Sequence, residues 1–160
     1  MREITERQMA DFQRFLSVLP HGQGAELVLL KGHILIEQQI NLLIERRLRN
    51  PQALREPNAA LDAIQAIRLA QSFFPAGHET EMWNSILKLN KLRNDIAHRI
   101  IPHQSIHDRI NDWVNSFPSG LGEVTDPSLR FEVSLWSLFD AVSEIVDTPN
   151  AEILQMPPKL

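Results

Sequence analysis

Residues 25–48 read AELVLLKGHILIEQQINLLIERRL, and this stretch decides the fold class. Its apolar residues fall almost all round a helix, which is typical of a helix that has neighbours on several sides. Asn50 and Pro51 end the pattern. Because polar residues such as His33 and Glu37 interrupt the apolar run, we interpret the segment as a core helix and not as a membrane span.

The segments on either side have the three- and four-residue apolar spacing of amphipathic helices. We expect these helices at about residues 3–19, 57–74, 79–99, 106–117 and 126–146. Asn58 is a predicted cap of the third helix and Asp126 of the last, where Pro127 would occupy the first turn. Several of their apolar side chains are predicted to face inward, among them Met9, Leu16, Leu61, Ile64 and Leu129.

No β-alternation of useful length appears, so the predicted fold class is all-α. At 160 residues and 43% hydrophobic content, the chain fits one domain with a core of its own. We expect a bundle of about six helices over residues 1–147. Residues 148–160, with three prolines, are expected to form an extended or disordered arm that could bind a partner.

The charge and cysteine content exclude several classes of function. The net charge of −4 provides no overall field that would draw the chain to nucleic acid or to anionic lipid, so any phosphate binding requires a local patch. There is no cysteine, which excludes disulfides, thiolate nucleophiles and sulfur-ligated metal sites. With no signal-like apolar run at the N-terminus, we expect a cytoplasmic protein.

Residues 89–99, LNKLRNDIAHR, contain the residues of most functional interest. On a helical projection Arg93 falls within the apolar half, and a buried guanidinium is costly unless it is paired. Asn90, Asn94 and His98 follow one another at four-residue intervals and form a polar line beside Arg93.

The central helix has a second polar line, formed by His33, Glu37 and Asn41. We hypothesise that Glu37 pairs with Arg93, since a carboxylate and a guanidinium compensate each other best in a bidentate pair. A purely structural interpretation also stays open. In that case Arg93 and the asparagines only tie helices together, and His98 only interacts with the helix dipole.

The hexapeptide from Arg93 to His98, RNDIAH, resembles the R-x4-6-H signature of the HEPN (higher eukaryote and prokaryote nucleotide-binding) superfamily. The order of helices is also similar to HEPN-type bundles, including mannitol-repressor-like proteins. This resemblance implies an all-α bundle that is usually a homodimer, with two copies of the motif at a cleft. Many such proteins are metal-independent endoribonucleases in toxin–antitoxin, abortive-infection or RNA-processing systems, and others are binding modules or regulators.

The resemblance implies a role for each residue of the motif. His98 would be the general acid or base, Arg93 would bind the scissile phosphate, and Asn94 would orient one of them. No metal or other cofactor is expected. Supporting residues would be Glu37, Asn90 and His33, and the expected contacts to the RNA backbone are Lys91, Arg99, Arg46 and Arg47.

Two functions from different classes therefore stay open. The first is a dimeric ribonuclease, such as a toxin held by an antitoxin partner. The second is a non-catalytic regulator that acts through protein contacts, which fits the negative charge and the absence of a basic recognition helix. A metal enzyme is disfavoured because His33 and Glu37 have ligand spacing but no HExxH signature accompanies them.

Overall fold

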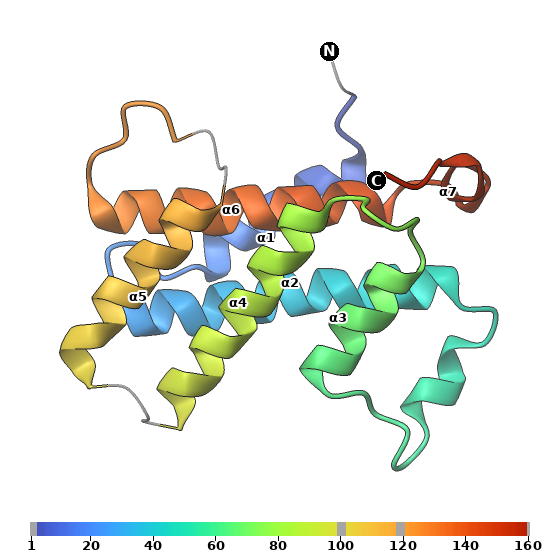
Figure 1. Ribbon diagram of the computed structural model, residues 1–160, viewed down its shortest axis with the longest axis horizontal. Helices are drawn as coiled ribbons and strands as arrows, with labels where there is room; N and C mark the ends of the chain where they lie inside the picture. The colour runs from blue at the N-terminus through green and yellow to red at the C-terminus, as the bar shows by residue number, and fades with distance from the viewer. Residues whose placement is uncertain (1–2, 99–101, 118–120, 160) are drawn as a thin grey trace.

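The computed structural model of the chain describes residues 3–98, 102–117 and 121–159 (Figure 1). Within these ranges the chain is all-α, with seven α-helices, one short 3-10 helix and no strand. The elements are α1 (Glu6–Val18), α2 (Ala25–Arg47), η1 (Pro51–Arg55), α3 (Ala63–Ser72), α4 (Thr80–Ala97), α5 (His103–Ser116), α6 (Pro127–Val146) and α7 (Asn150–Gln155).

The helix α2 occupies the centre, as its sequence predicts. It packs most extensively against α6, which runs beside it, and it also contacts α1, α3, α4 and η1 (Figure 1). Gly32 permits this close approach, since a Cβ at that position would lie 2.7 Å from a methyl carbon of Leu135. By length and hydropathy α2 could cross a membrane, but more than half of its most apolar window is buried against the other helices.

Local signals in the sequence set where two of the helices begin. At α6 the prediction is confirmed, because the carboxylate of Asp126 accepts a hydrogen bond from the backbone of Leu129 and Pro127 is the first helical residue. At α3 the predicted start is wrong. Asp62 caps the helix with a reciprocal contact to Gln65, whereas Asn58 has a left-handed backbone with φ of 69°.

The core contains side chains from all the longer helices, including the fully buried Trp83, Phe15 and Leu138. Several apolar residues that were expected to face inward are exposed instead. Ile64, on the first turn of α3, is 53% exposed, and Leu61 precedes that helix. Exposed apolar side chains also occur on α1 and α6, namely Met9, Leu16 and Leu129.

The C-terminal segment differs from the extended or disordered arm that was expected. It contains α7, whose Ile153 is buried, and the backbone N–H of Lys159 donates to the carbonyl of Ala76. Gly77 makes this approach possible, since a Cβ there would lie 2.0 Å from the carbonyl oxygen of Lys159. The tail is therefore fastened to the turn between α3 and α4.

Candidate functional site

The motif residues lie on the last three turns of α4. Asn90 is buried, Arg93 and Asn94 are half-buried, and His98 is exposed as the residue that caps the end of the helix. The backbone N–H of His98 donates to the carbonyl of Asn94 at 3.0 Å. The polar line thus runs from the interior of the protein to its surface along a single helix.

Arg93 makes a hydrogen bond to a neutral group. Its Nη1 donates to the side-chain oxygen of Asn94 at 2.9 Å. Among the described residues no carboxylate forms an ion pair with Arg93. A guanidinium has five N–H donors, so most of the hydrogen-bonding capacity of Arg93 and its full charge stay available to an anion.

The expected pair between Glu37 and Arg93 is absent from the described structure. The carboxylate of Glu37 instead lies 3.8 Å from Nδ1 of His33, one turn away on α2. The physical reason is that Arg93 is only half-buried. Water can solvate its charge, so the desolvation cost that would demand a carboxylate partner does not arise.

His33 joins the two polar lines. Its Nε2 donates to the side-chain oxygen of Asn90 at 3.1 Å, and both residues are buried between α2 and α4. Burial lowers the pKa of His33 and the charge of Arg93 lowers it further, while Glu37 and the contact with Asn90 act in the opposite direction. The imidazole is therefore neutral at pH 7, and its role is to fix α4 against α2.

Of the four predicted RNA-backbone contacts, the three within the described residues do not come together. Lys91 is exposed on α4, close in sequence to the motif, and Arg99 lies outside the described residues. Arg46 and Arg47 lie at the C-terminal end of α2, at the opposite side of the molecule from the end of α4 (Figure 1). They cannot share a phosphate with His98 of the same chain.

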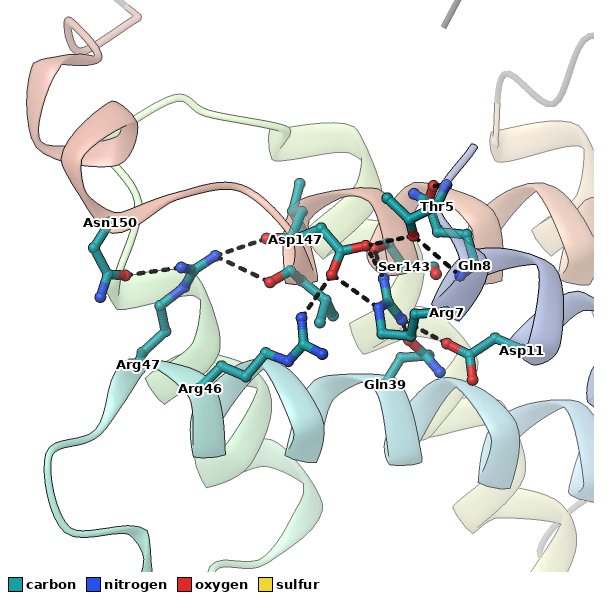
Figure 2. A network of polar contacts seen from close by, with 12 residues as sticks. Thr5, Arg7, Gln8, Asp11, Gln39, Arg46, Arg47, Ser143, Asp147 and Asn150 are labelled. Atoms are coloured by element: carbon teal, nitrogen blue, oxygen red, sulfur yellow. Dashed lines mark hydrogen bonds and ion pairs between the residues drawn. The ribbon is translucent and has the colours of Figure 1, made fainter. Parts of the chain in front are cut away.

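Arg46 and Arg47 have partners of their own at the end of α6. Arg46 pairs with Asp147 at 2.6 Å, and Arg47 donates to the side chain of Asn150 and to the carbonyl of Ile145, each at 2.8 Å (Figure 2). These contacts identify the two arginines as structural residues that hold the end of α2 against α6 and α7.

The same cluster contains an interaction that sequence reasoning missed. Arg7 on α1 donates to both carboxylate oxygens of Asp147, at 2.7 and 2.9 Å, and Thr5 donates to one of them (Figure 2). Burial by itself would raise the pKa of Asp147, but these donors and Arg46 outweigh it and hold that pKa below its ordinary value. No sequence pattern links residues this far apart, so only the fold could have shown the pair.

A shallow groove lies beside the motif, between α4 and α5, with a volume of about 270 Å³. Lys88 and Lys91 line it from α4, and Trp113 lines it from α5. Arg109 also lines the groove but pairs with Asp95 at 2.7 Å. The two lysines are thus the cations of this groove that the described structure leaves without an acidic partner.

No three metal-ligating side chains come together within the described part of the chain. Comparison of the chain with known protein families, with curated proteins and with solved structures found no match. A function for this protein therefore has to be inferred from its own residues.

Proposed function

We propose that this protein is a metal-independent endoribonuclease of the HEPN type, active as a homodimer whose cleft contains the motif of both subunits. The observation that carries the proposal is the state of Arg93. It is half-buried on α4, it contacts a neutral amide, and no described carboxylate neutralises it. Its charge is therefore free to bind a phosphate.

The proposed chemistry needs few groups. Cleavage of RNA without a metal requires removal of the proton from a 2′-hydroxyl, stabilisation of the charged phosphorane and protonation of the leaving 5′ oxygen. Histidine as a residue type titrates near neutral pH and suits both proton transfers. His98 is exposed and would carry one of them, and Arg93 would bind the phosphorane oxygens.

Helix geometry is the reason for proposing a dimer. Arg93 and His98 are five residues apart, which on an α-helix is a rise of about 7.5 Å and a rotation of about 140°. The two side chains of one subunit therefore diverge. We infer that Arg93 of one subunit and His98 of the other act on the same phosphate, and that two-fold symmetry supplies a second histidine.

The remaining residues have supporting roles in the proposal. Asn94 holds the guanidinium of Arg93 through their hydrogen bond. His33 and Asn90 hold α4 in place from beneath. Lys88 and Lys91, in the groove beside the motif, are the proposed contacts to the RNA backbone in place of Arg46 and Arg47.

The experiment is an RNA cleavage assay in EDTA. Wild-type protein is incubated with a mixture of single-stranded and structured RNAs beside Arg93→Ala, His98→Ala and a matched control, Arg68→Ala. The control removes an arginine on α3 whose side chain bonds Gln71 on its own helix. We expect wild type and control to cleave equally and the two motif variants to lose roughly 100-fold or more in rate.

Either of two results would refute the proposal. One is equal cleavage by all four proteins, which would indicate a contaminating nuclease. The other is no cleavage of any RNA by the folded wild-type protein. In that second case the non-catalytic regulator would be the better interpretation.

A further inference from the structure

An apolar groove runs along the outer side of α1 and α6. Two adjoining hollows form it, with volumes of about 330 and 290 Å³, and both are lined by Phe12 and Trp136. Met9, Leu16 and Leu129 border these rings and are 45%, 45% and 49% exposed. These are the side chains that helical periodicity assigned to the core, and within this chain nothing described covers them.

The floor of the groove is aromatic. The ring of Trp136 lies 4.4 Å from that of Phe12 and 5.4 Å from that of Phe15, measured between centroids. Single exposed apolar residues are ordinary on protein surfaces, but a continuous apolar patch with contributions from two helices is typical of an interaction site. Large aromatic side chains are also the usual centres of binding energy.

The charges around the groove are acidic. Asp140 lines one hollow, and among the described residues it has no ion pair. Glu132 lines the other, where His21 pairs with it at 2.7 Å. Glu6 lies one turn before Met9 on α1 and is exposed. No described lysine or arginine lines either hollow.

This charge distribution decides between possible occupants. Two copies of the chain that met through the groove would bury the carboxylates of both copies in one interface, with no described lysine or arginine lining it to neutralise them, and this is unfavourable. A partner with cations flanking its apolar residues would be attracted. From Glu6 to Val18 the groove follows α1 for about 18 Å, which matches a partner helix of roughly three to four turns.

We propose that this groove binds a basic amphipathic helix of a partner protein. The helix presents apolar residues at positions i, i+3 or i+4, and i+7 to the aromatic floor, and its lysines or arginines lie beside Asp140 and Glu6. The groove and the motif are on different parts of the fold, because α1 packs on α2 and α6 whereas the motif is at the far end of α4 (Figure 1). The inference is therefore independent of the ribonuclease proposal.

The test uses a tryptophan-free, 15-residue helical peptide with leucine on one face and lysine elsewhere, titrated into the full-length protein. Trp136 is partly exposed, whereas Trp83 and Trp113 are 0% and 4% exposed, so fluorescence reports on the groove. We expect saturable binding with a blue shift, weakened by salt. A peptide with glutamate in place of lysine should bind at least 10-fold more weakly.

Variants of the protein locate the binding. Met9→Glu puts a charge into the groove and should raise the Kd for the leucine/lysine peptide at least 10-fold. Leu154→Glu makes the same kind of change at an 86% exposed residue of α7 and should leave the Kd unchanged. Asp140→Lys should reverse the preference toward the glutamate peptide.

Three outcomes would overturn the proposal. The first is no binding of the lysine peptide. The second is equal affinity for Met9→Glu and Leu154→Glu, which would place the peptide elsewhere. The third is a dimer that Met9→Glu converts to monomer, because the groove would then be occupied by a second copy of the chain.

Discussion

Replacing Asp147 by asparagine should destabilise the protein more than any other single change from a carboxylate to an amide. Asp147 ends α6, and its carboxylate accepts hydrogen bonds from Thr5 and Arg7 near the start of the chain and from Arg46 on α2 (Figure 2). The variant keeps the shape of the side chain but removes the charge that these donors share.

The size of the effect follows from exposure. The side chains of Arg7 and Asp147 are 18% and 22% exposed, so water screens their pair weakly. A hydrogen bond to a charged group contributes about 1.5–3 kcal/mol, and loss of one partner of a buried pair costs about 3–5 kcal/mol. Arg46 is 43% exposed and adds at most about 1 kcal/mol. Since asparagine retains one acceptor oxygen, we expect a loss of about 2–4 kcal/mol in the free energy of unfolding.

The assay is urea unfolding followed by circular dichroism at pH 7, with Asp112→Asn on the exposed side of α5 as the control. For a chain of this length the loss corresponds to a Tm lower by roughly 4–16 °C. In a double-mutant cycle with Arg7→Gln, the double variant should lose less stability than the sum of the two single losses, since either single change breaks the same pair.

The pH dependence provides a second check. The pKa of Asp147 is lower in the folded state than in the unfolded state. The contribution of this carboxylate to the free energy of unfolding is therefore present at a pH above the unfolded-state pKa, and it is lost as the pH falls through the folded-state pKa. The difference between wild type and Asp147→Asn should therefore shrink below about pH 4. A variant within about 0.5 kcal/mol of wild type at pH 7 would show that the cluster is not a stabilising unit.

Of three further predictions, two concern the motif and its supports and the third concerns His21, which lines the apolar groove. Asn90→Ala leaves the buried N–H of His33 without an acceptor, so the free energy of unfolding should fall by about 1–3 kcal/mol. Urea unfolding measures this loss, and an unchanged midpoint of the urea transition would contradict the contact between His33 and Asn90. Mixing Arg93→Ala with His98→Ala should restore up to about a quarter of the wild-type RNA cleavage, because random exchange makes about half of the dimers mixed and each mixed dimer regains one of its two Arg93–His98 pairs. No recovery after subunit exchange would mean that each subunit supplies a complete site. The hydrogen bond to Glu132 and that to the carbonyl of Leu16 raise the pKa of His21. The stability that protonated His21 contributes is therefore present below pH 6.5 and is lost as the pH rises through the pKa of His21 in the folded state. An NMR titration should place that midpoint above 6.5, and His21→Gln should remove this pH dependence from thermal unfolding; a midpoint at or below 6.5 would refute it.

Helical periodicity predicted the all-α class and the central position of α2, because a helix that is apolar all round has to be enclosed. It also predicted the start of α6, where Asp126 and Pro127 act through contacts within one turn. Periodicity does not predict how far a neighbouring helix extends over an apolar stripe. Met9 and Leu129 therefore have the spacing of core residues and yet border an open groove.

The motif was found in the sequence, but its partners were not. A guanidinium in an apolar arc suggested a buried pair with Glu37, and the structure gives a half-buried Arg93 beside Asn94. Helical spacing gives the direction of a side chain around its axis and not its depth in the protein. For Arg46 the sequence showed a cation at a helix end, while its acidic partner comes from a residue 101 positions later.

The ion pair between Arg7 and Asp147 joins residues that are 140 positions apart. The rings of Phe12 and Phe15 on α1 also pack against Trp136 and Phe139 of α6. During synthesis α1 therefore has no α6 to pack against until the chain has been made as far as Val146. Until then its aromatic side is open to water, to other nascent chains and to chaperones. We expect α1 to reach its native packing only after α6 has been made, and truncations that remove α6 to leave α1 without its main support.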